Sequence, residues 1–193
     1  TGGLVTYVGY HLPPPKGYVF VPFNESGGRW HEWEWAVKKG FTKTVVTTEG
    51  VEILVFDTHT CSWTHNYQTR RRQIEQLLRD SDIRERRYPV ILAGDFNFDV
   101  MTASNGTENI PPEALQLREA GFVSCVQGRQ GDFSTFRRGN DYVRERDIRD
   151  LGRDMMLDGV YTRDGDGVDM VPEEVKVIRL KRGEEVSDHD GLL

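Results

Sequence analysis

Asp95 and Asn97 lie two residues apart, directly after a short apolar run that ends before Gly94. A carboxylate supplies the oxygen ligands that a hard cation prefers, and an amide can donate to a phosphoryl oxygen as negative charge develops. The pair therefore has the residue types for metal-assisted phosphoryl chemistry. An Asx-type turn that closes a strand uses the same residues, so the pair alone leaves both interpretations open.

Three further polar clusters contain His59, Asp158 and the pair Asp188-His189. A lone histidine such as His59 is more often structural than catalytic. Asp158 is different because it interrupts an apolar segment, and a buried carboxylate without a partner costs several kcal/mol. A histidine is a natural partner for it, and a histidine oriented by a carboxylate is the recurrent form of a general base.

The elements that must position these residues are predicted by hydrophobic patterning. Residues 90–93 are rich in branched apolar side chains, which predicts a strand buried on both faces. A hairpin is predicted around Glu49-Gly50, and its second strand leads to His59. In open α/β sheets ligands bind beyond the carboxyl ends of the strands, where Asp95 and His59 are expected. The expected strands comprise residues 4–10, 41–48, 51–56, 88–93, 122–126, 155–162 and 174–180.

Helical periodicity appears twice. Residues 66–79 place Ile74, Leu77 and Leu78 on one face and arginines on the other. A shorter helix is predicted over residues 113–120, with Gly121 as its stop, and the segment before it is expected to be a polar loop. Helix, strand and polar tip in succession indicate an α/β sheet. No repeat or linker divides the chain, so residues 1–193 are predicted to be a single domain.

Composition and charge exclude several classes of protein. No apolar run approaches the about 18 residues of a membrane span. The formal net charge of −6 argues against a broad electrostatic surface for duplex nucleic acid. Cys61 and Cys125 are too few for a disulfide framework, and no Cys/His spacing indicates zinc. The two glycosylation sequons, at residues 24–26 and 105–107, permit secretion without establishing it, so the compartment stays open.

Arginine and tryptophan stretches each admit two interpretations. Arg70-Arg71-Arg72, residues 84–87 and Arg137-Arg138 are most simply solvated faces, although they could line a local basic groove. Trp30, Trp33 and Trp35 could form a platform at a membrane surface. Packing in the core or at an edge is the favoured interpretation of that cluster.

These residues together resemble the endonuclease/exonuclease/phosphatase superfamily, which includes pancreatic deoxyribonuclease, abasic-site endonucleases, inositol-polyphosphate phosphatases and neutral sphingomyelinases. The resemblance rests on residues 88–97, on Asp57-Thr58-His59-Thr60 and on Ser187-Asp188-His189. Lys38-Lys39-Gly40-Phe41 and the strand at residues 51–60 that ends in the histidine look most like the neutral sphingomyelinase branch. Arg70-x-x-Gln73-Ile74-x-x-Leu77 matches the helix that usually follows this histidine in the superfamily. The resemblance implies a deoxyribonuclease-like, four-layer α/β sandwich of two sheets.

The resemblance also implies a role for each site residue. His189 would take a proton from the attacking water, and Asp158 would orient that histidine. His59 would donate to a phosphate oxygen, Asn97 would hold the phosphoryl group, and Asp95 would position the water or the leaving group. A divalent cation, Mg²⁺ or Mn²⁺, would neutralise the phosphate. Its implied ligands are Asp95, Asn97 and Asp188.

Two departures from the superfamily pattern limit this assignment. Members carry an N-terminal strand with an asparagine and then a metal-binding glutamate, which cannot be assigned here. Glu25, Glu32 and Glu34 lie on the wrong side of the first matched strand. We therefore expect a chain truncated at both ends that binds Mg²⁺ weakly and turns over poorly until the missing segment is restored. Thr60, where many relatives have leucine, is a mild departure with no evident chemical consequence.

The expected activity is hydrolysis of a phosphodiester by in-line attack of water. A sphingomyelin-like phospholipid is the first-choice substrate, which implies peripheral contact with a membrane. A nuclease or a phosphoinositide phosphatase of the same superfamily is the alternative enzyme. A non-catalytic module that kept the fold is the alternative from another class, although the joint presence of Asp95, Asn97, Asp158, Asp188 and His189 argues against it.

Overall fold

A computed structural model describes residues 12–27, 36–105, 110–140, 143, 153–179, 187 and 189–192. The predicted strand at residues 4–10, the three tryptophans and Asp188 lie outside the described residues. So do Glu32 and Glu34. None of the helices in the described part of the chain has the length and apolar character needed to cross a membrane.

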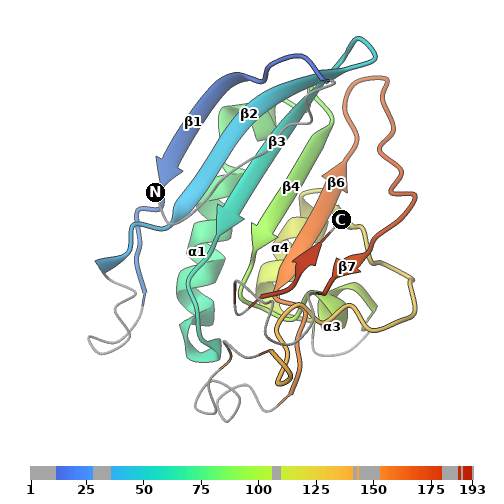
Figure 1. Cartoon of the computed structure of the whole chain (residues 1–193). Helices are drawn as coiled ribbons and strands as arrows, with labels where there is room; N and C mark the ends of the chain where they lie inside the picture. Colours follow the sequence, from blue (N-terminus) through green and yellow to red (C-terminus); the bar gives the residue numbers. More distant parts are fainter. Residues whose placement is uncertain are drawn as a thin grey trace.

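A six-stranded mixed sheet forms the centre of the described structure, in the order β1-β2-β3-β4-β6-β5 (Figure 1). Its strands are β1 Lys16–Pro22, β2 Gly40–Thr48, β3 Val51–His59, β4 Val90–Asp95, β5 Val123–Ser124 and β6 Asp158–Arg163. Only β3 and β4 run parallel among these neighbouring pairs. A second, two-stranded sheet pairs β7 Val177–Ile178 with β8 Gly191–Leu192.

The predicted hairpin is confirmed as β2 and β3. Its turn residues, Glu49 and Gly50, have φ angles of 50° and 80°. A two-residue turn with positive φ at both positions matches the right-handed twist of its strands. This turn fixes the register in which Phe41 pairs with Thr58, and so it fixes where β3 ends.

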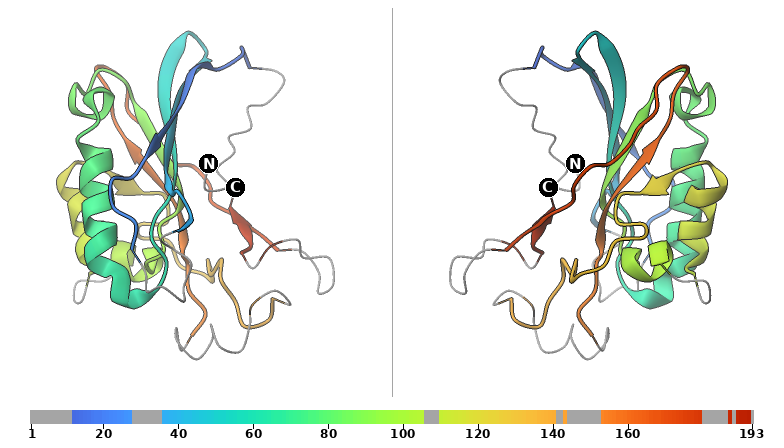
Figure 2. Two further views of the ribbon diagram at one scale, coloured as in Figure 1. Left: turned by 90° about the vertical axis from the view of Figure 1, so that its left-hand side faces the viewer. Right: turned by 90° about the vertical axis from the view of Figure 1, so that its right-hand side faces the viewer.

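Helices cover one face of the large sheet, and the small sheet lies on the other side (Figure 2). The helical segments are η3 Thr64–Asn66, α1 Tyr67–Leu78, α2 Ser81–Arg84, α3 Val100–Asn105 and α4 Pro112–Glu119. Helices α1 and α4 confirm the two predicted from periodicity. Among the described residues no helix covers the outer side of β7 and β8, so three of the four expected layers are seen. The two-sheet α/β architecture itself is confirmed.

Helix α3 corrects the expectation of a polar loop in this region. Asp99, just before the helix, is the residue that could have indicated it. Its carboxylate accepts hydrogen bonds from the Met101 N–H at 3.2 Å and from the Thr102 hydroxyl at 2.7 Å. An acidic side chain that satisfies the first backbone donors of a helix stabilises its start.

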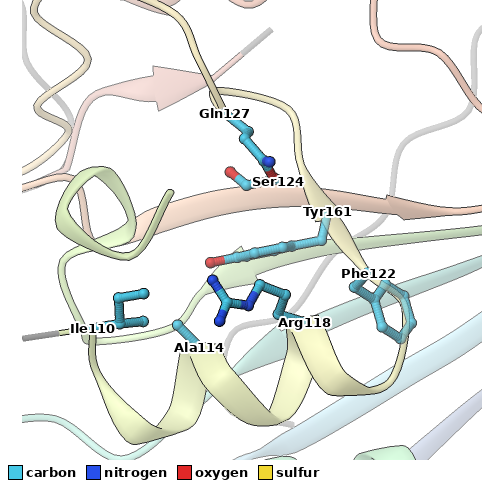
Figure 3. A pocket seen from close by; sticks show the side chains of 7 residues that line it. All are labelled: Ile110, Ala114, Arg118, Phe122, Ser124, Gln127 and Tyr161. Carbon is cyan, nitrogen blue, oxygen red and sulfur yellow. The ribbon is translucent and has the colours of Figure 1, made fainter. Parts of the chain in front are cut away.

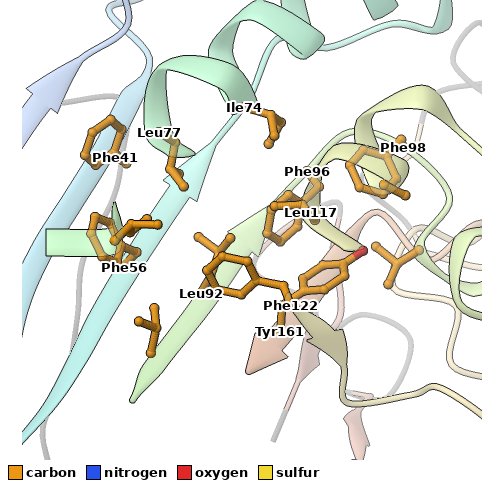
Figure 4. Close-up of a cluster of buried hydrophobic side chains, with 14 of the residues drawn as sticks. Phe41, Phe56, Ile74, Leu77, Leu92, Phe96, Phe98, Leu117, Phe122 and Tyr161 are labelled. Atoms are coloured by element: carbon orange, nitrogen blue, oxygen red, sulfur yellow. The ribbon is translucent and has the colours of Figure 1, made fainter. Parts of the chain in front are cut away.

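The core lies between α1, α4 and the large sheet (Figure 4). Ile74, Leu77 and Leu117 from the helices are fully buried against it, as are Phe56 and Leu92 from the strands. Strand β4 is fully buried only on this side, since its alternate residues Ile91 and Ala93 are half-buried. The expectation that β4 is buried on both faces is therefore wrong, because the smaller sheet covers the opposite face less completely.

Several predicted strands are shorter than expected. The pattern at residues 122–126 yields only β5, and the one at residues 174–180 yields only β7. The strand expected from residue 155 begins at Asp158, because Met155 pairs with Phe136 instead. Cys61 and Cys125 are both buried and are not joined in a disulfide.

The arginine-rich face predicted for α1 is wrong for Arg70. Its side chain is 4% exposed and its Nε lies 2.9 Å from Glu113 Oε1, which is 1% exposed. The guanidinium also donates to the carbonyls of Cys61 and Trp63. A buried charge needs such partners, and this pair joins α1 to α4 behind the sheet.

Candidate functional site

The register of the large sheet brings three predicted residues into one row. His59 pairs with Asp95 across β3 and β4, and Asp95 pairs with Asp158 across β4 and β6. Because side chains alternate along strands, this row lies on the face opposite the fully buried Phe56 and Leu92. The site therefore lies on the side of the small sheet, at the end where β3 and β4 finish.

Gly94 permits this close alignment. Its φ is +132°, and a Cβ placed there would lie 2.0 Å from the Thr58 carbonyl oxygen. Any other residue would push β4 away from β3 at the point where His59 and Asp95 pair. The glycine in the sequence motif thus has a steric role directly behind the site.

His189 is the histidine partner that burial of Asp158 leads one to expect and that the family resemblance implied. His189 Nδ1 lies 2.6 Å from Asp158 Oδ2, and the two side chains are 20% and 23% exposed. When Asp158 is ionised and the imidazole is neutral, Nδ1 donates to the carboxylate and Nε2 has the lone pair, because an ionised carboxylate only accepts hydrogen bonds. The Phe136 ring packs edge-on against the imidazole, with 5.5 Å between ring centroids. The imidazole is thereby fixed with Nε2 on the side of Asp95, 3.9 Å from its Oδ2.

Asp95 lies between the two histidines. Its Oδ2 is 3.4 Å from His59 Nε2, and its Oδ1 accepts from the Asn97 N–H at 2.9 Å. Asp95 therefore forms the Asx turn and can also act in the site, because the turn holds its carboxylate in place. Burial, and then the charge of Asp158, raise the pKa of Asp95 to about 7, against the opposing effect of His189. A carboxyl group with such a pKa is typical of a functional site.

Asn97 is held beside Asp95 by a network that sequence reasoning missed. Its backbone has a φ of +52°, and its amide nitrogen donates to the Thr60 carbonyl at 3.1 Å. The buried Lys39 donates to the same carbonyl at 2.9 Å. The Thr60 hydroxyl donates to the Phe96 carbonyl at 2.6 Å. Thr60 therefore does have a chemical consequence, contrary to expectation, because leucine could not make this bond between the ends of β3 and β4.

The described side chains fit a divalent cation. Asp95, Asp158 and His189 each offer a ligand atom, and these atoms lie within 4.8 Å of one another. Mg²⁺ and Mn²⁺ prefer oxygen ligands, which the two carboxylates supply. Of the predicted ligands, Asp95 is in this cluster, Asn97 is bonded to it, and Asp188 lies outside the described residues. Glu25 is instead paired with Arg72 at 2.8 Å.

A cavity on the helical side of the sheet is a poor candidate for the chemistry. It has a volume of about 20 Å³, which is room for one water molecule. The buried Tyr161 hydroxyl, which has no hydrogen-bond partner among the described residues, points into it (Figure 3). The cavity is lined by Ile110, Ala114, Arg118, Phe122, Ser124, Gln127 and Tyr161. None of the predicted site residues lines it.

The chain is similar to known proteins in structure but not in sequence. No protein-family model matches the chain, and no curated protein sequence matches it. TDP2 from D. rerio, in complex with a single-strand DNA product, matches with a TM-score of 0.62 at 18% identity, over 94% of this chain and 66% of that one. Sphingomyelinase C from Streptomyces griseocarneus matches with a TM-score of 0.63 at 20% identity, over 93% of this chain and 63% of that one.

Beta toxin from Staphylococcus aureus matches with a TM-score of 0.62 at 19% identity, over 93% of this chain and 63% of that one. The chain thus spans slightly less than two thirds of the length of these structures. All three belong to the endonuclease/exonuclease/phosphatase superfamily. The described fold is the fold of that superfamily, as the sequence motifs predicted.

Proposed function

We propose that residues 1–193 form a single domain that carries the catalytic core of a divalent-metal-dependent phosphodiester hydrolase. The observation that carries the proposal is the arrangement of His189, Asp158 and Asp95. One carboxylate fixes Nδ1 of the imidazole, and a second lies 3.9 Å from its Nε2. This is the arrangement of a general base directed at a bound water.

Each predicted residue has a role consistent with its contacts. One water can hydrogen-bond to both His189 Nε2 and Asp95 Oδ2, because atoms 3.9 Å apart can share a partner. His189 takes the proton of that water as it attacks phosphorus, and Asp158 stabilises the imidazolium that forms. The bond from phosphorus to the leaving oxygen breaks in line with the attack, and the departing alkoxide takes a proton from solvent. Asn97 uses one N–H to bond Thr60, which leaves the other for a phosphoryl oxygen. His59, at the end of β3, donates to another phosphoryl oxygen.

The cation we propose is Mg²⁺ or Mn²⁺, held by Asp95 with Asn97 and Asp188 as further ligands. Asp158 and His189, the other two members of the cluster around Asp95, then stay paired with each other as the general base. When bound, it neutralises the charge of the phosphate and of the transition state. The weak binding of Mg²⁺ expected from the sequence stays a prediction. Equilibrium binding of Mg²⁺ to the chain measures it directly.

The first-choice substrate is a sphingomyelin-like phospholipid. The likeness to sphingomyelinase C and the net charge of −6 support it. Peripheral contact with a membrane follows from this choice. A nucleic acid is the second candidate, and the likeness to TDP2 in complex with a single-strand DNA product favours it equally. Either choice leaves the compartment open.

The test uses the protein that contains this chain, purified beside His189→Ala. Release of phosphocholine from sphingomyelin vesicles is measured with Mg²⁺ and with a chelator. We expect Mg²⁺-dependent release that falls by about 10²–10⁴-fold in the variant. His65→Ala, at an exposed histidine in η3, is the matched control and should keep full activity.

The other outcomes separate the alternatives. Cleavage of single-strand DNA or of a phosphoinositide, without release from lipid, would keep the mechanism and change the substrate. No hydrolysis of any of these substrates would contradict the proposal and favour a binding module.

A further inference from the structure

The two residues of the general-base pair come from different sheets. Asp158 begins β6 of the large sheet, whereas His189 lies just before β8 of the small sheet. A two-stranded sheet is marginally stable by itself. Something else must therefore hold His189 at 2.6 Å from Asp158.

The segment at residues 135–140 lies between them. Its Phe136 forms isolated bridges with Met155, close to Asp158, and with His189. The Phe136 N–H and carbonyl both bond to Met155, at 2.9 and 3.0 Å. The segment is thus a third strip of backbone that contacts both partners.

Thr135 connects the two sides directly. It is fully buried, and its hydroxyl accepts from the backbone N–H groups of Leu157 at 3.1 Å and Asp158 at 3.2 Å. Its carbonyl accepts from the Asp190 N–H at 2.7 Å. One residue therefore bonds to the backbone of Asp158 and to the residue that follows His189.

Two further contacts hold the flanks of His189. Arg137 donates to Asp190 through two of its guanidinium nitrogens, Nε to Oδ2 and Nη2 to Oδ1, the latter at 3.1 Å. The Asp190 side chain is 2% exposed, which makes this charged pair costly to break. On the other flank, the buried Asn140 donates to the Ser187 carbonyl at 2.9 Å.

We propose that residues 135–140 are a positioning strip, in which Thr135, Arg137 and Asn140 hold His189 in register with Asp158. The strip acts through the backbone and through Asp190, so its members are positioning residues rather than catalytic ones. Its kinetic consequence rests on the proposed function, but its geometric consequence does not. A displacement of about 1 Å at such a pair can lower the rate by about 10²-fold.

The first test compares Thr135→Val with Thr135→Ser. Valine keeps the shape of threonine and removes the acceptor for Leu157 and Asp158, whereas serine keeps the acceptor. We expect kcat to fall by about 10–100-fold in Thr135→Val, with KM nearly unchanged, and to recover in Thr135→Ser. Equal loss in both variants, or a change confined to KM, would overturn the role of the hydroxyl.

The second test reads the geometry without activity. ¹⁵N NMR of histidine-labelled protein at a pH where imidazole is neutral distinguishes Nδ1–H from Nε2–H, and His189→Gln assigns the signal. We expect His189 to be Nδ1–H in the unmodified protein and to gain Nε2–H character in Thr135→Val and in Arg137→Met. Arg138→Met, which removes an exposed pair with Asp154, is the matched control and should leave the signal unchanged.

These readouts keep the two proposals distinguishable. An unchanged tautomer in both folded variants would overturn the positioning strip. If Thr135→Val fails to fold, the tautomer of His189 in Arg137→Met decides, and an unchanged tautomer there would overturn the positioning strip. If the unmodified protein hydrolyses no phosphodiester, the proposed function fails while the tautomer still tests the strip.

Discussion

The two faces of the large sheet differ: one packs against the helices and the other presents the candidate site, although both are formed by the same strands. Along β3, Leu54 and Phe56 face the helices and are 2% and 0% exposed, whereas Asp57 and His59 face the opposite side and are half-buried. Both faces also contain buried charge. On the helical side Arg70 and Glu113 neutralise each other, whereas on the opposite side burial raises the pKa of Asp57 to about 6 and that of Asp95 to about 7.

This difference shows that burial of a charge does not by itself mark a functional site. The Arg70–Glu113 pair has opposite charges and several backbone partners, so it stabilises packing. Asp95 instead has another carboxylate, Asp158, among its nearest charges. A site of this kind costs stability in the absence of a cation, which is expected of a functional constellation.

The largest change in stability is expected when the buried ion pair on the helical face is broken. Glu113→Ala leaves the buried guanidinium of Arg70 without its carboxylate, and should lower the free energy of unfolding by about 3–5 kcal/mol. Urea denaturation measures it. Glu75→Ala, which removes an exposed pair with Arg79, should cost less than about 1 kcal/mol. Similar losses in the two variants would show that burial does not make the Arg70–Glu113 pair more important for stability than an exposed pair.

Substitution of Asp95 is expected to stabilise the metal-free protein, whereas substitution of Glu113 destabilises it. Since its pKa is raised from 3.8 to about 7, the folded protein keeps the proton over a range where the unfolded chain has lost it. The stabilising contribution is complete below about pH 4 and is lost as the pH rises to about 7. In metal-free protein at pH 8, Asp95→Asn should therefore raise the free energy of unfolding by about 2–4 kcal/mol while abolishing activity.

Thermal unfolding between pH 4 and pH 8, with and without Mg²⁺, measures this effect. Asparagine can still accept from the Asn97 N–H, so the turn is retained. Added Mg²⁺ should stabilise the unmodified protein more than the variant. A variant that is less stable than the unmodified protein at pH 8 would contradict the raised pKa.

The smallest change in stability is expected on substitution of Asp57. This residue lies on the same face of the sheet as the site but outside the row formed by His59, Asp95 and Asp158. Its pKa of about 6 predicts that stability falls between about pH 4 and pH 6. Asp57→Asn should raise the free energy of unfolding at pH 8 by about 1–2 kcal/mol and leave kcat close to its original value. Chemical denaturation beside the hydrolysis assay checks both, and a large loss of kcat would place Asp57 in the site.

The sequence allowed much of this to be predicted where the signal is local. The hairpin turn at Glu49-Gly50, the two longer helices and the pairing of Asp158 with a histidine follow from patterning or from the cost of burying a charge. The row of His59, Asp95 and Asp158 depends on register between strands, which local patterns do not determine. Arg70 was mistaken for a solvated residue because its partner Glu113 lies in another helix. Thr135 gave no signal, because it lies in a charged, glycine-rich stretch and bonds to residues far away in the sequence. Arg137 was interpreted as part of a solvated face because its partner Asp190 is equally distant in the sequence.

The parallel pairing of β3 with β4 has a kinetic consequence. Parallel strands need a crossover connection, and here α1 and α2 lie between the two strands in the chain. Pairings that close long loops form late, because the entropy of closure is lost before the contacts compensate for it. His59, Asp95 and Asp158 thus become neighbours only once β6 has joined β4. A partly folded chain would accordingly lack the row of site residues, so the proposed hydrolase activity is expected only once the sheet is complete.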